Sequence, residues 1–168
     1  MLASSTIDSA TLNRSNQLPT YSCVRDHVFG FSSSRLGFGS LYSVNSGVNN
    51  SLKDDCLVYS CAALGVVHDL KTNTQVFFDG HTDDISCIAL CTPPYIGGYL
   101  VATGQMGKAP VLLLWSFKAT ASGSIETSPS LATIGKGFFQ RMVVSAVFSF
   151  DGAYITAISG DDHHMMWA

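Results

Sequence analysis

Residues 143–167 read VVSAVFSFDGAYITAISGDDHHMMW, and this stretch decides the fold. Two runs rich in β-branched and aromatic residues, 143–150 and 153–159, flank the dipeptide Asp151-Gly152, which is typical of a tight turn. A third run, 163–167, follows the Gly-Asp-Asp segment and ends at Trp167. The stretch therefore predicts three short strands in succession.

An earlier part of the chain repeats this pattern. Gly80-His81 is followed by apolar runs at 85–90, 99–103 and 111–115, and the last of these runs ends at Trp115. Trp115 lies 34 positions after His81, within a repeat of roughly 40–45 residues. Both stretches resemble WD40 blades. We therefore expect an all-β fold, a partial WD40 β-propeller of two to three blades of four-stranded antiparallel sheet that is a fragment of a larger propeller.

The rest of the chain supports the all-β interpretation, since no segment has a convincing helical period. Further strands are predicted at 57–62, 64–70, 74–78 and 131–134. Two segments are predicted to be linkers: 32–55, which is rich in Ser, Gly and Asn, and 119–130, which is rich in Ala, Ser and Thr.

A buried polar chain accompanies the WD40 pattern: a His after Gly, a Ser or Thr on the second strand, an Asp in the next turn, and a Trp indole. Each buried donor or acceptor needs a partner, and such a chain supplies one. The residues in these roles are His81, Thr103 and Trp115 in the first repeat, and Ser159, Asp161 and Trp167 in the second. Counting back from Trp115 places the first turn Asp at Ala109, and Gly135-Lys136 or a nearby pair replaces the second Gly-His. We interpret all six residues as structural.

The amino-acid composition excludes some classes of binding partner. Nine Lys and Arg against 12 Asp and Glu give a net charge of -3, and only 12% of residues are charged, where about 25% is usual. This charge balance excludes a basic nucleic-acid binder, so we expect no nucleic-acid partner. No apolar run approaches the length of a membrane-spanning helix, so we expect no membrane partner. The five cysteines include no Cys-x-x-Cys pair and are interpreted as buried thiols in a reducing compartment.

Enzymatic motifs are missing. The chain has no GxxxxGK[ST], HExxH or GxSxG, and Gly135-x-Gly137 lacks the third glycine of a dinucleotide site. Glu126 is the only glutamate. His163 and His164 would point to opposite faces of a strand, so a turn is favoured there over a metal site. We expect no catalytic, cofactor-binding or metal-binding residues.

A more specific resemblance rests on LVY at 57–59, AALGVVHD at 62–69, GHTDDI at 80–85, ATGQ at 102–105 and the IGxGFF of 134–139. With these residues the chain resembles the echinoderm microtubule-associated protein-like (EMAP-like) family. Val28-Phe29-Gly30-Phe31 resembles the Val-Tyr-Gly-Tyr of that family's HELP motif, although Ser32-Ser33 stand where Arg-Gly usually follow. The expected organisation is a disordered leader at 1–20, a HELP-like segment with a Ser/Gly/Asn-rich loop at 21–56, and WD40 repeats at 57–168. Within the repeats we expect a partial blade at 57–79, a blade at 80–134 and an incomplete blade at 135–168.

The resemblance implies a non-enzymatic cytoskeletal scaffold in the cytoplasm that binds tubulin or microtubules through a propeller surface. Further blades or another chain would be needed to close the ring. The alternative is a WD40 protein–protein interaction adaptor in a non-tubulin assembly, since a net charge of -3 gives no steering toward acidic microtubules. Candidate aromatic anchors are Phe29, Phe31, Phe138 and Phe139, but for each of them burial between blades is the favoured interpretation.

Overall fold

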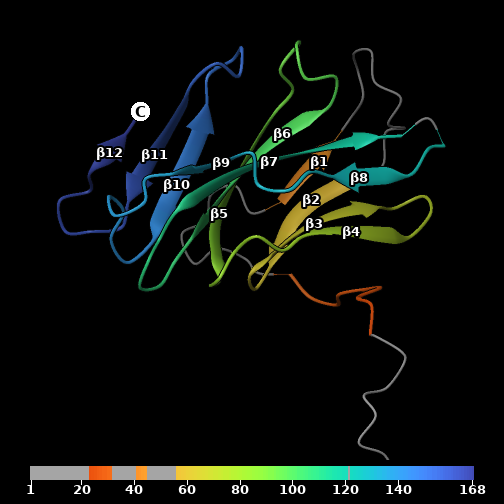
Figure 1. Ribbon diagram of the computed structural model, residues 1–168, viewed down its shortest axis with the longest axis horizontal. Coiled ribbons are helices and arrows are strands. Elements are labelled where there is room, and N and C mark those ends of the chain that lie inside the picture. Colours follow the sequence, from red (N-terminus) through yellow and green to blue (C-terminus); the bar gives the residue numbers. More distant parts are fainter. Residues whose placement is uncertain (1–22, 32–40, 45–55, 121) are drawn as a thin grey trace, which may run out of the picture.

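Three antiparallel sheets lie side by side in the computed structural model, which describes residues 23–31, 41–44, 56–120 and 122–168 (Figure 1). The first sheet has the order β1-β2-β3-β4, the second β5-β6-β7-β8 with β9 also paired to β7, and the third β10-β11-β12. The strands are β1 Leu41–Val44, β2 Cys56–Cys61, β3 Leu64–Asp69, β4 Thr74–Phe78, β5 Ile85–Cys91, β6 Tyr99–Gln105, β7 Leu112–Ala119, β8 Ile125–Thr127, β9 Ala132–Ile134, β10 Val143–Phe148, β11 Ile155–Ser159 and β12 Met166–Trp167. The predicted all-β class, with sheets like partial propeller blades, is confirmed.

Local side-chain chemistry explains why neighbouring strands pair in sequence order. Between β3 and β4 the Asp69 carboxylate accepts the backbone N–H groups of Lys71 and Thr72 at 2.8 and 3.2 Å. Asn73 then takes a positive φ of 54°, which Asn tolerates better than most residues. The turn reverses the chain and sets the register in which Asp69 lies opposite Thr74.

Two apolar clusters fill the spaces between successive sheets. The first joins the first two sheets and includes Phe78 and Trp115, whose rings stack with centroids 4.8 Å apart and planes 4° apart. The second joins the second and third sheets through small residues such as Ala102 and Ala157, both fully buried. Each sheet is thus covered by the next along the chain.

Gly104 is required where the second and third sheets meet. A Cβ atom on Gly104 would lie 2.6 Å from Cβ of Val143 and 2.7 Å from Sγ of Cys87. Nearby, the Ser86 hydroxyl donates to the carbonyl of Val143 at 2.7 Å, so a polar contact accompanies this close approach. The two sheets are therefore held at a distance that a side chain at Gly104 would not allow.

Two strands lie in segments predicted to be linkers. β1 lies within 32–55 and pairs Leu41 with Tyr59, and β8 lies within 119–130 and pairs Ile125 with Ala119. The linker prediction is wrong at these two strands, whose four and three residues stand among small polar residues and carry no clear alternating pattern. β12 is shorter than the predicted run 163–167, because the Asp161 carboxylate accepts the N–H of His163 at 2.8 Å and forms a turn.

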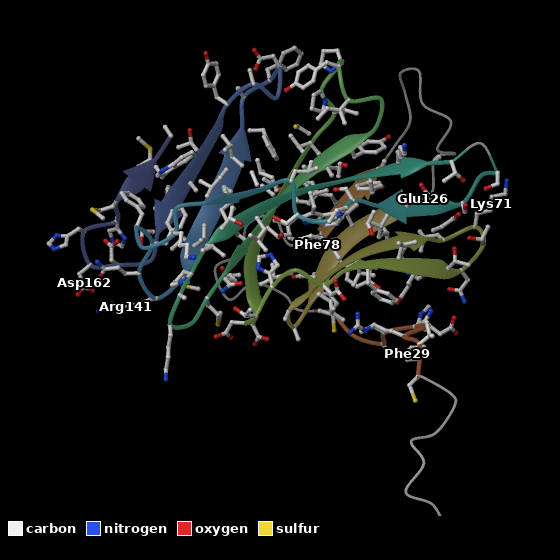
Figure 2. The ribbon with its side chains drawn as sticks, viewed as in Figure 1. Phe29, Lys71, Phe78, Glu126, Arg141 and Asp162 are labelled. Atoms are coloured by element: carbon white, nitrogen blue, oxygen red, sulfur yellow. The ribbon has the colours of Figure 1, made fainter. Side chains whose placement is uncertain are left out.

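Burial also differs from expectation at the amino-terminal end. Phe29, labelled in Figure 2, is 90% exposed, and Phe31 is 49% exposed, so neither is buried between blades as predicted. Phe139, in contrast, is only 3% exposed. Phe138 is partly buried against the second cluster.

The cysteines only partly match the prediction of buried thiols. Cys56 and Cys87 are buried and Cys61 and Cys91 are partly buried, but Cys23 is exposed. Burial raises the pKa of the Cys87 thiol to about 12 and that of Cys91 to about 11, so both thiols are protonated at neutral pH.

Among the described residues, no helix has the length and apolar character needed to cross a membrane.

Phe78→Ala should lower the free energy of unfolding by about 3–5 kcal/mol, since it removes the ring that stacks on Trp115. The matched control Phe29→Ala should change it by less than about 0.5 kcal/mol, because that ring faces solvent. Urea denaturation followed by tryptophan fluorescence measures both values. Equal losses in the two variants would contradict the described packing.

Candidate functional site

Four buried side chains form a continuous polar chain: three lie on strands of the second sheet, and His81 lies in the connection before β5. Nε1 of Trp115 donates to Oγ1 of Thr103 at 3.1 Å, and Oγ1 of Thr103 lies 2.7 Å from Nε2 of His81. Nδ1 of His81 lies 2.8 Å from Oε1 of Gln105. The structure therefore brings together His81, Thr103 and Trp115, and it adds a fourth residue that the sequence analysis had not assigned to the chain.

The proton positions in this chain follow from Gln105. Its amide nitrogen donates to the hydroxyl of Thr82 at 3.2 Å and to the carbonyl of Ala109 at 3.0 Å, so the atom facing His81 is the carbonyl oxygen, which only accepts. Nδ1 of His81 must carry the proton, and Nε2 of the neutral ring then accepts the Thr103 hydroxyl. Every donor runs in one direction, from Trp115 through Thr103 and His81 to Gln105.

Gln105 takes the role that the sequence analysis sought at Ala109. Counting back from Trp115 failed because the connection between β6 and β7 is long, whereas Thr103 and Gln105 are two apart on the strand β6 and therefore share a face. Counting forward from Thr103 would have found Gln105. In the third sheet the same step of two leads from Ser159 to Asp161.

In the third sheet, the residues equivalent to Thr103 and Trp115 form different hydrogen bonds. Ala157 lies opposite Trp167, as Val101 lies opposite Trp115, so Ser159 corresponds to Thr103. The Ser159 hydroxyl accepts the backbone N–H of Gln140 at 3.0 Å, so its partner is a backbone donor and not an imidazole. In the described part of the chain Trp167 is only partly buried, and its indole makes no counterpart of the bond from Trp115.

Asp161 is buried and ionised. The Ser159 hydroxyl, together with the backbone N–H groups of His163 and Met165, holds the pKa of Asp161 below its usual value, although burial opposes this. Oδ2 of Asp161 has no hydrogen-bond partner among the described residues. The structure thus places Ser159 and Asp161 side by side without a histidine between them.

Burial lowers the pKa of His81, and the hydrogen bond to Gln105 offsets this only in part. A carboxylate in place of Gln105 would favour the imidazolium, but the neutral amide does not. His81 is therefore a neutral structural histidine at pH 7.

The residues interpreted above as HELP-like, Val28, Phe29, Gly30 and Phe31, lie in a segment without regular structure against the first sheet, below it in Figure 1. The Gln75 side chain holds this segment: Oε1 accepts the N–H of Val28 at 2.8 Å, and Nε2 donates to the Val28 carbonyl at 3.2 Å. Phe31 lies edge-on to Tyr59 with centroids 6.2 Å apart. The segment is fixed through its backbone while Phe29 faces outward.

None of these groups forms a reaction centre within the described residues. His163 and His164 lie in the turn that the Asp161 carboxylate forms, and the exposed Asp162 pairs there with Arg141 at 2.8 Å. No group of three or more His, Cys, Asp or Glu residues in the described part of the chain is arranged to hold a metal. The four side chains of the polar chain are themselves buried.

The fold and the polar chain define the class of protein: a WD-repeat-like region made of partial propeller blades. No protein-family model matches the chain. Its sequence is 28% identical over 167 residues to rat echinoderm microtubule-associated protein-like 1, and this alignment covers 95% of this chain and 18% of the relative. The 77 kDa echinoderm microtubule-associated protein of Lytechinus variegatus is 28% identical over 171 residues, or 22% of its length.

Human WD repeat-containing protein 90 is 33% identical over 108 residues, which is 64% of this chain and 5% of that protein. The chain therefore spans less than a quarter of these relatives. It is a distant homologue of the EMAP-like proteins and is related to a second WD-repeat protein.

Thr103→Val should lower the free energy of unfolding by about 2–4 kcal/mol, since it leaves the Trp115 indole and Nε2 of His81 without partners. Thr133→Val, on the exposed side of β9, is the matched control and should have little effect. Thr103→Ser keeps the hydroxyl and should recover part of the loss. Urea denaturation of the three variants measures these differences, and a neutral Thr103→Val would contradict the buried chain.

The stability of the chain should depend on pH through His81. The folded state holds this proton less tightly than the unfolded chain, so the His81 contribution is complete above about pH 6.5 and is lost as pH falls below it. Gln105→Glu should raise the pKa of His81, because a carboxylate then faces Nδ1. NMR titration of the His81 ring measures the shift, with Gln140→Glu as a control that adds the same charge to the third sheet. A His81 pKa that is lower in Gln105→Glu than in the unchanged chain would contradict the contact between residue 105 and Nδ1 of His81.

Proposed function

We propose that this chain is a non-enzymatic scaffold module that binds tubulin or microtubules through the surface of its WD40-type blades, in the cytoplasmic cytoskeleton. One observation carries the proposal. The alignment with rat echinoderm microtubule-associated protein-like 1 extends over 95% of the chain, and that relative is by name microtubule-associated. The succession of three sheets, with related polar positions in the second and third, gives the alignment a structural basis.

The chemistry of the described residues favours a scaffold over an enzyme. The groups that could take part in catalysis, such as His81 and Thr103, are buried and bonded to each other. Loops and strand edges are then the parts of the blades left for contact with a partner. A rigid set of sheets suits this role, since little conformational entropy is lost when such a surface binds.

The outer face of the third sheet supports the need for further blades or another chain. Ile158 occupies the position that Ala102 has in the second sheet, because each lies one residue before the Ser or Thr of the polar chain. Ala102 is fully buried under the third sheet, but Ile158 is 37% exposed and its neighbour Met166 is 66% exposed. This apolar face fits another blade of the same kind.

The finer organisation belongs to the same proposal. The segment clamped by Gln75 is proposed to be HELP-like, and the three sheets are proposed to be successive WD40 repeats divided near residues 80 and 135. The leader predicted at 1–20 lies outside the described residues.

A second candidate function is a WD40 adaptor in a non-tubulin assembly. Its support is the net charge of -3, which gives no electrostatic attraction to an acidic microtubule surface, and the relationship to WD repeat-containing protein 90.

Tubulin binding is tested with the full 168-residue chain. We expect it to co-sediment with taxol-stabilised microtubules, or to co-elute with soluble tubulin in gel filtration, because the EMAP-like surface should be retained. Sedimentation without microtubules is the control for aggregation. A folded chain that stays in the supernatant and elutes alone would contradict the proposal, and a pull-down that captures other proteins but no tubulin would favour the adaptor.

A further inference from the structure

An aromatic surface lies at one end of the molecule, away from the polar chain. It is formed by two loops, residues 92–98 between β5 and β6 and residues 149–154 between β10 and β11, which both lie at the top of Figure 1. Tyr95 is 65% exposed, Tyr154 is 76% exposed and Phe150 is fully exposed. We call Tyr95, Phe150, Asp151 and Tyr154 the aromatic end surface.

The backbone under this surface is well fixed. The Tyr95 hydroxyl donates to the Gly152 carbonyl at 2.9 Å and so joins the two loops. Within the second loop, Ser149 N–H donates to the Tyr154 carbonyl, and Tyr154 N–H donates to the Ser149 hydroxyl, both at 2.9 Å. Gly152 has a φ of 69°, and a Cβ atom there would lie 2.9 Å from Pro93. The backbone that carries the rings is thus held by these bonds, so binding would require little further ordering of the loops.

The fold does not require these rings. The turn at Asp151-Gly152 is formed by backbone groups and by the Ser149 and Asp151 side chains, and neither Phe150 nor Tyr154 contributes its ring to a core cluster. Exposed aromatic side chains on a fixed backbone are typical of interaction surfaces, where Tyr and Phe supply large contact areas.

The charge of the surface indicates which partner it fits. Residues 92–98 and 149–154 contain no Lys, Arg, His or Glu, and Asp151 is their one acidic residue. The Ser149 hydroxyl and the Ala153 N–H both bond to Oδ1 of Asp151 and hold its pKa below the usual value. Aromatic faces and a carboxylate both attract cations. An acidic segment would be repelled.

We propose that the aromatic end surface binds a basic peptide segment, with an arginine of the partner stacked on one of the exposed rings and paired with Asp151. Arginine fits best, because its planar guanidinium stacks on aromatic faces and bonds carboxylates in the same plane. This proposal rests on the exposure and charge of the two loops alone, so it does not depend on the function proposed above. The surface would let the blades hold a second, basic partner.

The test uses the full chain and three fluorescein-labelled peptides of equal length, built from Gly and Ser with interspersed Arg, Glu or Pro. Fluorescence polarisation should detect binding of the Arg peptide above the other two, and added salt should weaken it. Phe150→Ala and Tyr154→Ala should each weaken binding about two- to fivefold, the size of one exposed cation–π contact. Asp151→Asn should also weaken it, while keeping an oxygen for Ser149 and Ala153.

Phe29→Ala is the matched control, since it removes another exposed Phe from the opposite end of the molecule (Figure 2) and should leave binding unchanged. Thermal melting of each variant checks that the fold is retained, as the full exposure of Phe150 leads us to expect. Equal binding of all three peptides, preference for the Pro or Glu peptide, or unchanged affinity in Phe150→Ala and Tyr154→Ala would overturn the proposal. Stronger binding of the chain to phosphatidylcholine vesicles than to the Arg peptide would also overturn the proposal.

Discussion

The Thr103 hydroxyl is the contact on which the middle of the structure depends. It is fully buried, it accepts from the Trp115 indole, and it donates to His81. Because it meets both needs at once, the largest side chain of the first cluster and an imidazole can be buried together without an unpaired polar group. Trp115 then stacks on Phe78, so the polar chain within the second sheet also sets how the first sheet packs on it.

The third sheet shows which part of this arrangement is essential. It keeps a hydroxyl, at Ser159, but this hydroxyl accepts the backbone N–H of Gln140, whereas the Thr103 hydroxyl donates to a histidine. Its Trp167 is less buried, and the sheet has only three strands in the described part of the chain. The buried hydroxyl and the polar residue two positions later are common to both sheets, while the histidine is not.

Much of this could be predicted from the sequence. The turn dipeptide Asp151-Gly152 and the apolar runs around it located β10 and β11, and the His-to-Trp spacing located the second sheet. β1 and β8 could not be found, because strands of three or four residues are stabilised by pairing with a longer neighbour rather than by their own pattern. The exposure of Phe29 was also out of reach, since the backbone of its segment, and not its ring, is held by Gln75.

Gln105 pairs with a histidine, whereas Asp161 pairs with a backbone donor. This difference bears on how such repeats change during evolution. A neutral acceptor suits a neutral histidine, whereas a carboxylate suits backbone N–H groups at a turn. The histidine position and the acceptor position are therefore constrained as a pair. In the third sheet both differ from the second, and Oδ1 of Asp161 still accepts the N–H of His163. A blade changed in this way loses the residues by which a WD40 repeat is most easily recognised in a sequence, while its packing with neighbouring blades is retained.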